Sequence, residues 1–415
     1  MSWSENSIWW HTYQLGFCGA PIRPDRPQTQ ISHRLPRLTD WLDYLIQLGA
    51  NGLLLGPIFS SSSHGYDTTD HFTIDRRLGD LGDFTKLIDL AHRRGIKVML
   101  DGVFNHVGRQ HPWVQRALNE GPDGQYAHFF TIDWSDPADP KPLCFEGSFD
   151  LVVLNHQSPA VVDYVVDVMN TWCDRGADAW RLDAAYAVDP GFWAQVLPRV
   201  RQRHPEVYVL AEMIHGDYSA YLERAGMDSI TQYELWKATW SALDTQNFFE
   251  LDWTLQRHND LLTHFLPFTF VGNHDVTRIA SKIGPDKAIL ALVVLLTVGG
   301  SPAIYAGDEQ GFTGVKYDRS GGDDEVRAPF PDSPDQLAGF GASTHALHQQ
   351  LIALRRQRPW LTRALTEQLA LTNERYTYRS IAADDSAQFT VTLDVQGAPT
   401  AEIREGDNLI FSFSG

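Results

Sequence analysis

Several apolar stretches of this chain end abruptly in side chains that could do acid–base chemistry. Asp and Asn are poor strand residues and are costly to bury without partners. A single polar strand end is usually a cap or an ion pair, but four such ends indicate a shared site. The residues at these four ends are Asp101, Asn105 and His106, then Arg181 and Asp183, then Glu212, and last Asn273, His274 and Asp275.

Three of these residues are carboxylates that we expect to converge: Asp183, Glu212 and Asp275. Carboxyl groups in different environments suit acid–base work at an acetal, because an ionised one attacks the anomeric carbon while a protonated one releases the leaving oxygen. Arg181 lies two residues before Asp183, so both project to one side of a strand, and the arginine charge would keep Asp183 ionised. No Ser–His–Asp arrangement is evident in the sequence. A zinc site is not predicted either, because the histidines are not at helical i, i+4 spacing.

The elements that carry these residues alternate between short aliphatic runs and amphipathic helical patterns. Alternation of this kind predicts a parallel sheet, and at 415 residues it favours a closed (β/α)8 TIM barrel. A doubly wound open sheet is the alternative, but the Gly-rich phosphate loop expected after its first strand is absent. Strands are expected at 8–17, 51–59, 96–104, 177–185, 207–213, 229–235, 268–274 and 301–309, and the main helices at 38–49, 83–95, 161–176, 191–204 and 288–300.

Two segments break the alternation. Residues 107–151 are rich in Gly, Pro and Asp and are too long for a βα loop of about 2–6 residues, so we interpret them as a short inserted subdomain after strand three. From residue 359 onward, period-two patterns predict a small C-terminal antiparallel β-domain, 359–415. The barrel itself is then formed by 1–106 and 152–358.

Composition excludes several classes of partner. The net charge of −18 disfavours nucleic acid and anionic membranes, and the apolar run 288–300 is too short to span a bilayer. Cys18, Cys144 and Cys173 form neither a metal-type spacing nor a disulfide framework. The N-terminal residues do not resemble a signal peptide, so we expect a cytoplasmic protein with a small-molecule substrate. Its oligomeric state is not predicted.

In these residues the chain resembles the α-amylase family of glycoside hydrolases. The matching motifs cover residues from about 8 to 330 in the order and spacing of the family. Each motif is weak alone, but the ordered set is highly specific. They are GLLLGPIF (52–59), HGYDTTDHF (64–72), DGVFNH (101–106), AWRLDAA (179–185), LAEM (210–213), FVGNHD (270–275) and GSPAIYAGDEQG (300–311).

The resemblance implies a retaining mechanism on α-glucosidic bonds. Asp183 would be the nucleophile and Glu212 the acid–base residue, and Asp275 would bind the 2- and 3-hydroxyls of the reacting glucose. The other implied roles are as follows: Arg181 holds Asp183, His106 and His274 hydrogen-bond sugar hydroxyls, Tyr66 stacks under the sugar ring, and Asp101 is structural.

Departures from the family pattern concern calcium and the substrate. Relatives that bind calcium use the strand-three Asn and a His four residues past the nucleophile; here Asn105 is present but the second position is Ala187. We therefore expect no cofactor, calcium being possible only at an incomplete site. A lysine common in endo-amylases is replaced by Tyr186, and an aspartate common in exo-glucosidases by Ser63. Arg327 could bind a terminal sugar or form a loop salt bridge.

The sequence-based hypothesis is a retaining α-glycosidase of the α-glucosidase or cyclomaltodextrinase type. It would act on short α-glucosides of the maltooligosaccharide class, with α-1,4 linkages favoured. A transglycosylase is the alternative, since it would use Asp183 and Glu212 with a sugar hydroxyl as acceptor. A remoter alternative is an inactive carbohydrate-binding relative, but such proteins usually lose the nucleophile or the acid.

Overall fold

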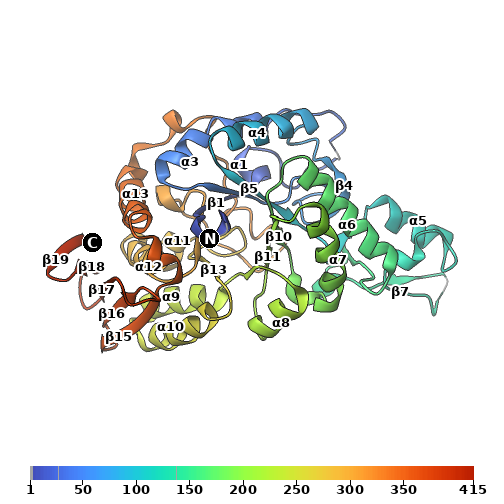
Figure 1. Ribbon diagram of the computed structural model, residues 1–415. Coiled ribbons are helices and arrows are strands. Elements are labelled where there is room, and N and C mark those ends of the chain that lie inside the picture. Colours follow the sequence, from blue (N-terminus) through green and yellow to red (C-terminus); the bar gives the residue numbers. More distant parts are fainter. Residues whose placement is uncertain (1–2, 27, 137) are drawn as a thin grey trace. The chain divides into compact units, whose positions relative to one another are not determined.

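The computed structural model describes residues 3–26, 28–136 and 138–415. Within them, eight parallel strands form one sheet in the order β12-β11-β10-β5-β2-β1-β14-β13. A parallel bridge between Thr231, directly after β12, and Phe268 of β13 also joins the two end strands. The predicted (β/α)8 barrel is confirmed (Figure 1). Its strands are β1 (Trp9–Thr12), β2 (Gly52–Leu55), β5 (Lys97–Gly102), β10 (Ala179–Leu182), β11 (Tyr208–Ala211), β12 (Ser229–Ile230), β13 (Phe268–Phe270) and β14 (Ser301–Tyr305).

Amphipathic helices connect these strands. Helix α4 begins with a capping box in which Asp80 accepts hydrogen bonds from the first turn, and it buries Phe84, Leu87 and Ile88. The helices are α1 (Gln14–Phe17), α2 (Pro36–Thr39), α3 (Leu42–Leu48), α4 (Leu81–Arg93), α5 (Pro112–Glu120), α6 (Pro159–Asp174), α7 (Pro190–Arg203), α8 (Tyr218–Ala225), α9 (Tyr233–Thr245), α10 (Phe249–Leu262), α11 (Ile279–Ile283), α12 (Pro285–Thr297) and α13 (Ala342–Arg356).

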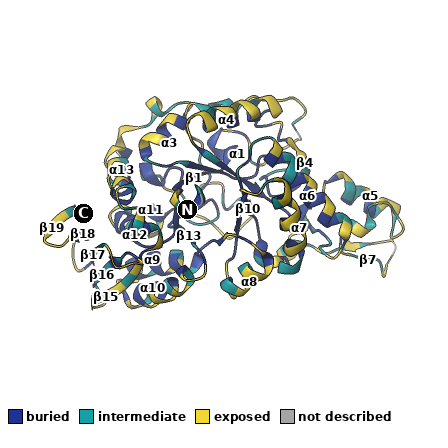
Figure 2. Ribbon diagram, viewed as in Figure 1, coloured by how far each residue is buried: buried dark blue, intermediate teal, exposed yellow. Residues whose placement is uncertain are grey.

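The chain divides into two compact units. Unit 1 comprises Met1–Thr12, Asp43–Leu53 and Ser229–Gly415, and unit 2 comprises Tyr13–Leu42 and Leu54–Asp228. Unit 2 carries β5, β10 and β11, and unit 1 carries β1, β12, β13 and β14. Every residue of β10 is buried, and Figure 2 draws this strand in dark blue. Each unit is described by itself below.

In unit 2, strand register sets the positions of the polar strand ends. Strand β10 pairs with β5 so that Arg181 lies opposite Asp101, and with β11 so that Leu182 lies opposite Ala211. Asp183 and Glu212 therefore follow directly after paired positions. Their backbone N–H groups continue the ladder, because Asp183 donates to Gly102 and Glu212 donates to Leu182.

The segment after β5 forms small β-structures of its own within unit 2. Strand β6 (His106–Gly108) pairs antiparallel with β9 (Leu151–Val153), and β7 (Ile132–Asp133) pairs with β8 (Lys141–Pro142). A short hairpin, β3 (Phe59–Ser61) with β4 (Thr68–Ile74), follows β2.

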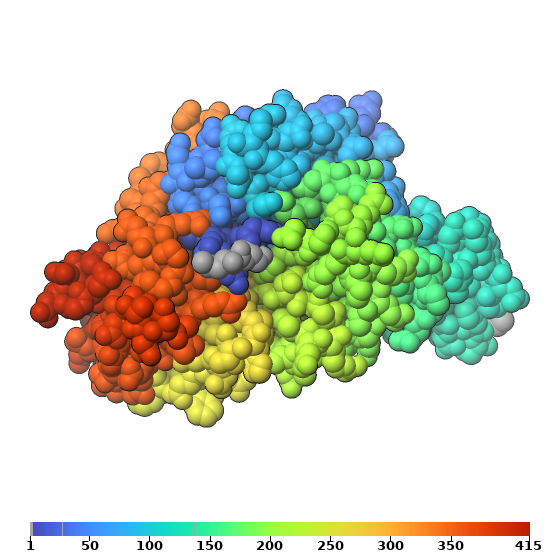
Figure 3. Space-filling view, viewed as in Figure 1, coloured from blue at the N-terminus to red at the C-terminus, as the bar shows by residue number. Residues whose placement is uncertain are grey.

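In unit 1, helix α12 is buried from Ile289 to Thr297, as expected for the apolar run 288–300. The C-terminal strands form an antiparallel sheet in sequence order and contact α10 and α12. Figure 3 colours the atoms of this C-terminal segment from orange-red to red. The strands are β15 (Leu365–Leu371), β16 (Arg375–Ile381), β17 (Gln388–Asp394), β18 (Thr400–Glu405) and β19 (Asn408–Ser414).

Three elements differ from the sequence-based expectation. The first strand ends at Thr12, and Gln14–Phe17 is helical because the N–H groups of Phe17 and Cys18 turn back to Tyr13 and Gln14. The helix expected at 38–49 is interrupted at Asp40, because the backbone N–H groups there bond to carbonyl oxygens only three residues earlier. The sixth strand has only two residues, because the Gln232 side chain accepts from Leu235 N–H and starts α9.

None of the helices in the described ranges combines the length and the apolar character needed to cross a lipid bilayer.

Buried neutral histidines make the stability of this fold sensitive to acid. His71 is fully buried, with Nε2 2.8 Å from the Val103 carbonyl oxygen and Nδ1 2.9 Å from the Tyr164 hydroxyl. Burial lowers its pKa from 6.5 to about 4, partly offset by the hydrogen bond to Val103. Between these two pH values the unfolded chain binds more protons than the folded one, so the free energy of unfolding falls as the pH drops.

We expect urea unfolding to become easier between pH 6.5 and pH 4, with His71 contributing up to about 1.4 kcal/mol per pH unit. The His71→Gln variant, whose amide does not titrate, should show a shallower pH dependence than the parent. The control is His264→Gln at an exposed position, which should keep the parental slope. Equal slopes for the parent and His71→Gln would contradict this explanation.

Candidate functional site

The Arg181 guanidinium is the centre of the polar cluster in unit 2. Its Nη1 lies 2.7 and 2.8 Å from the two carboxylate oxygens of Asp101 and 3.2 Å from Oδ1 of Asp183. Its Nη2 lies 2.5 Å from Oε1 of Glu212. One cation thus contacts three carboxylates, and all four side chains are buried.

The surrounding carboxylates stabilise the charged form of Arg181. Burial alone would lower the pKa of Arg181, but the charges of Asp101 and Glu212 outweigh it and raise the pKa well above its ordinary value. Asp101 makes the two shortest contacts to Nη1 and also accepts a hydrogen bond from the Tyr66 hydroxyl at 3.0 Å. Asp101 therefore fixes both the guanidinium and the Tyr66 ring, and only 8% of Tyr66 is exposed.

The backbone just after Asp183 adopts an unusual conformation. Ala184 has φ 45° and ψ 38°, in the left-handed region that non-glycine residues avoid. This turn points the Ala184 N–H at Glu212, whose Oε2 accepts it at 2.9 Å. The strained residue thereby connects the end of β10 to the carboxylate that follows β11.

His106 lies in unit 2 and begins β6, in the segment that follows β5. Its Nε2 is 3.1 Å from the Tyr66 carbonyl oxygen, and its Nδ1 is 3.1 Å from Nδ2 of Asn105. Its ring stacks on Phe145 with the centroids 4.9 Å apart. Burial lowers its pKa to about 3, so the ring is neutral at physiological pH.

The residues expected to bind calcium do not fit that ion. Nδ2 of Asn105 contacts Nδ1 of His106, and the second expected ligand position is Ala187, which has no side-chain oxygen to offer. Hard oxygen ligands are what calcium requires. This position is therefore given no metal-dependent role in the proposed reaction.

The segment after β5 contacts the loop after β10, and this contact was not predicted from the sequence. The Tyr186 hydroxyl donates to Oε1 of Glu146 at 2.8 Å, and the Tyr186 N–H donates to the carbonyl of Glu212 at 3.3 Å. Burial, and then the hydrogen bond to Glu146, raise the pKa of Tyr186. Glu146 also has a positive φ of 50°. No spacing signal predicts this pair, because it depends on the path of residues 107–151.

In unit 1, Asp275 follows β13 and is held by two side chains. Nη2 of Arg327 lies 2.8 Å from its Oδ1, and Nε2 of His274 lies 2.9 Å from its Oδ2. Arg327 also donates from Nε to the His274 carbonyl at 3.0 Å and pairs with Asp323 at 3.2 Å. The Asp275 side chain remains 29% exposed, whereas His274 is fully buried.

The structure thus groups the predicted site residues within each unit. In unit 2 it brings together Tyr66, Asp101, Arg181, Asp183 and Glu212, with His106 against the backbone of Tyr66. In unit 1 it brings together His274, Asp275 and Arg327.

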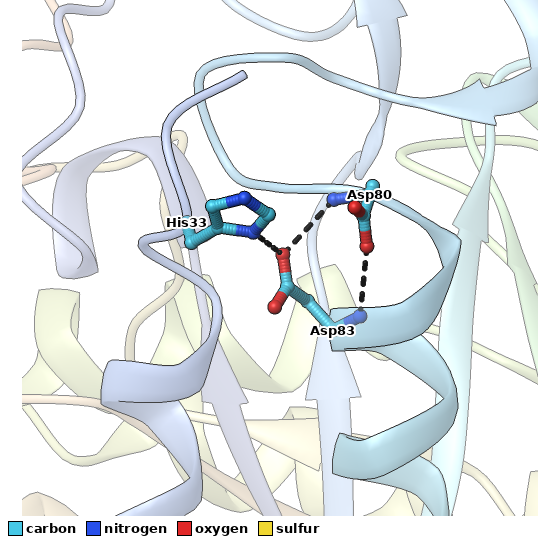
Figure 4. A group of neighbouring side chains, drawn as sticks. All are labelled: His33, Asp80 and Asp83. Atoms are coloured by element: carbon cyan, nitrogen blue, oxygen red, sulfur yellow. Dashed lines mark hydrogen bonds and ion pairs between the residues drawn. The ribbon is translucent and has the colours of Figure 1, made fainter.

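Among the described residues, one group has the spacing of metal ligands: His33, Asp80 and Asp83 (Figure 4). The carboxylate oxygens of this group accept hydrogen bonds within the protein. Asp80 and Asp83 form the capping box of α4, and Nδ1 of His33 lies 2.6 Å from Oδ2 of Asp83. The hydrogen bond to Asp83 raises the pKa of His33. The group is a helix cap with an added ion pair.

Comparison with known proteins gives consistent matches. The chain is 32% identical over 401 residues to a cyclomaltodextrinase of Geobacillus thermopakistaniensis, covering 90% of this chain and 66% of that protein. It is 32% identical over 293 residues to an intracellular maltogenic amylase of Bacillus subtilis, covering 68% of this chain and 49% of that protein. The chain therefore spans about half to two thirds of the length of these relatives.

A solved structure shares the fold over nearly the whole chain. It is the cyclic α-maltosyl-(1→6)-maltose hydrolase of Arthrobacter globiformis, with a TM-score of 0.81 and 23% identity, covering 96% of this chain and 92% of that one. The family model described as "Alpha amylase, catalytic domain" matches residues 34–357. With its polar strand ends, its barrel and this match, the chain belongs to the α-amylase family.

Proposed function

We propose that this chain is a retaining α-glycosidase that hydrolyses short α-glucosides of the maltooligosaccharide type, with α-1,4 linkages favoured. The observation that carries the proposal is the sharing of Arg181 by Asp183 and Glu212. Two carboxylates on one guanidinium are close neighbours, and retaining enzymes need a pair about 5–5.5 Å apart. The name of the 32% identical relative, cyclomaltodextrinase, supports an oligosaccharide substrate.

In the proposed first step, Asp183 forms a bond to the anomeric carbon while the glycosidic C–O bond breaks. Glu212 gives its proton to the departing oxygen. In the second step, a water oxygen bonds to the anomeric carbon, the ester to Asp183 breaks, and Glu212 takes the proton from water. Asp275 binds the hydroxyls of the reacting sugar, and Arg327 and His274 orient its carboxylate.

Glu212 accepts hydrogen bonds at both oxygens, from Arg181 and from the Ala184 N–H. To act as an acid it must instead present a proton to the substrate. We propose that the arriving glycosidic oxygen replaces one of these contacts. Hydrogen bonds of catalytic groups commonly rearrange in this way when the substrate binds.

A cytoplasmic location is also proposed. Cys18, Cys144 and Cys173 are free thiols, as expected in a reducing compartment. The Bacillus subtilis relative is named an intracellular maltogenic amylase. Transfer of the glycosyl unit to a sugar acceptor would use the same residues, so product analysis separates transfer from hydrolysis.

The first test is the pair of catalytic variants. With maltotriose, Asp183→Asn should lower kcat by roughly 10⁴-fold or more, and Glu212→Gln by about 10²- to 10⁴-fold. With an aryl α-glucoside whose phenol leaves without protonation, Glu212→Gln should be impaired less in the bond-breaking step. Both are measured by steady-state and burst kinetics.

The control for these variants is Glu223→Gln at an exposed position of α8, which should behave as the parent. Products are identified with and without added maltose. Release of free sugars alone supports hydrolysis, and longer oligosaccharides formed from the added acceptor support transfer. If the parent and Asp183→Asn release sugar equally poorly, the proposed function is wrong.

The second test concerns Asp101 as a positioning residue. Asp101→Asn keeps the side-chain shape but removes the counter-charge that makes both short contacts to Nη1 of Arg181 in a buried site. Breaking a buried ion pair in this way costs about 3–5 kcal/mol, so we expect a loss of this size in the free energy of unfolding, measured with urea. Asp89→Asn, exposed on α4, is the matched control. A variant as stable as the parent would refute the role.

The third test is metal removal. Because Ala187 offers no side-chain oxygen and leaves the expected calcium site incomplete, we propose that hydrolysis is independent of metal ions. Dialysis against EDTA should leave kcat and KM for maltotriose unchanged. A loss of activity that calcium chloride restores would overturn this expectation.

A further inference from the structure

A cavity in unit 1 lies at the N-terminal ends of β1 and β14, and the mechanism above does not use it. Its volume is about 330 Å³, many times the space that one water molecule needs. Strand β14 runs parallel to β1 and β13, so this end of the sheet is opposite to the end at which Asp275 follows β13. We call it the arginine cavity, lined among others by Glu5, Ile8, Pro302, Arg355, Arg356 and Thr362.

Arg355 is the buried cation of the arginine cavity, with only 5% of the residue exposed. Its Nη1 donates to the carbonyls of Leu296 and Val298, at 3.1 and 2.8 Å. Its Nη2 donates to the carbonyls of Gly300 and Leu361, at 2.7 and 3.4 Å. These four bonds use the four Nη hydrogens. The fifth donor of the guanidinium, the Nε–H, has no acceptor among the described residues.

No carboxylate of the described residues balances the charge of Arg355. The residues outside the described ranges have no acidic side chain either. Burial, and then the charge of Arg356, lower the pKa of Arg355 from 12.5 to about 9. Carbonyl dipoles offset the cost of a buried cation only in part. An anion in the cavity would therefore stabilise the charged guanidinium.

Arg356 adds a second cation to the same cavity. Its guanidinium donates to the carbonyls of Asn6 and Gly49 and to Oδ1 of Asn51, at distances between 2.6 and 3.1 Å. Like Arg355, it forms no ion pair with any described residue. Two guanidinium groups thus line one cavity without a counter-charge.

The neighbouring charges are paired with one another. Among the described residues that line the cavity, Glu5 alone is acidic, and one of its carboxylate oxygens lies 2.9 Å from Nη2 of Arg363. Arg358 pairs with Glu405 at 2.8 Å and does not line the cavity. The two arginines that line the cavity are therefore the two that have no carboxylate partner.

Two uncompensated cations favour a ligand with two negative charges. A phosphate monoester carries a charge of about −1.5 to −2 near pH 7 and three acceptor oxygens, whereas a single carboxylate carries one charge. Arginine also has the geometry that binds phosphate oxygens. The Thr362 hydroxyl has no hydrogen-bond partner among the described residues, and Ile8 and Pro302 add apolar surface. The cavity thus has room and contacts for the organic part of an ester.

We propose that the arginine cavity binds a small phosphate monoester, whose phosphate contacts Arg355 and Arg356. Active sites of barrels of this kind lie at the carboxyl ends of the strands, so the ligand is not the reacting sugar. This site is additional to the proposed hydrolysis and does not depend on it. Because the ligand binds the folded chain, it also raises the free energy of unfolding.

Binding is tested by titration calorimetry of the full chain with glycerol 3-phosphate, and glycerol is the neutral control. We expect one ester bound per chain, weaker binding of inorganic phosphate and of malonate, and no binding of glycerol. Inorganic phosphate binding as tightly as the ester would overturn the choice of an ester. Tighter binding of malonate would overturn the choice of phosphate. If none of these anions binds, the site itself is refuted.

Two substitutions locate the bound anion. Arg356→Gln should weaken the Kd for glycerol 3-phosphate at least tenfold, the size of a lost charge-assisted contact. Its control is Arg358→Gln, whose parent side chain pairs with Glu405 outside the cavity. Thr362→Glu should weaken the Kd by a similar factor, because it adds a negative charge to the cavity wall. Gln357→Glu adds the same charge at an exposed position outside the cavity and should keep the parental Kd.

Thermal unfolding without ligand shows whether each variant folds. If Arg356→Gln does not fold, Thr362→Glu decides, because Thr362 makes no side-chain hydrogen bond that the substitution would break. A Kd that stays at the parental value in the folded cavity variants would overturn the arginine cavity as the place of binding. The measurement follows anion binding alone, so its outcome is separate from that of the hydrolysis tests.

Discussion

The candidate chemistry of unit 2 depends on one buried cation. Arg181 contacts Asp101, Asp183 and Glu212 at once. A buried guanidinium with three carboxylates around it is stable only if charge and hydrogen bonds are satisfied together. Asp101 supplies the permanent partner, which leaves the other two carboxylates near the cation but open to a substrate. The same set of contacts therefore holds the strand ends in place and brings Asp183 and Glu212 to one guanidinium.

Strand register explains why this arrangement is reproducible. Arg181 lies opposite Asp101 across the ladder between β10 and β5, so side-chain pairing follows from backbone pairing. The left-handed Ala184 then turns the chain so that its N–H meets Glu212. In unit 1 the arrangement differs: Arg327 and His274 each contact one carboxylate oxygen of Asp275. Each carboxylate is positioned by a cation or donor fixed to a neighbouring element.

The barrel could be predicted from sequence because its strands are apolar until their ends and alternate with amphipathic helices. Details that depend on local hydrogen bonds could not be predicted from the sequence. The helical turn at Gln14–Phe17 and the two-residue β12 both arise from backbone and Gln232 contacts that leave no periodic signal. For the site, the contact of Arg181 with Asp183 follows from their spacing of two on a strand. The pairing of Glu146 with Tyr186 joins residues 40 positions apart, and only the path of the intervening chain brings them together.

The bond between Tyr186 and Glu146 has a consequence for how such enzymes diversify. Tyr186 is tied by its hydroxyl to the segment after β5 and by its N–H to the backbone of Glu212. A length change in that segment would thus be transmitted to the loop beside Glu212, while the strands and their carboxylates stay as they are. One peripheral segment can therefore reshape the surroundings of Glu212 without any change in the barrel strands.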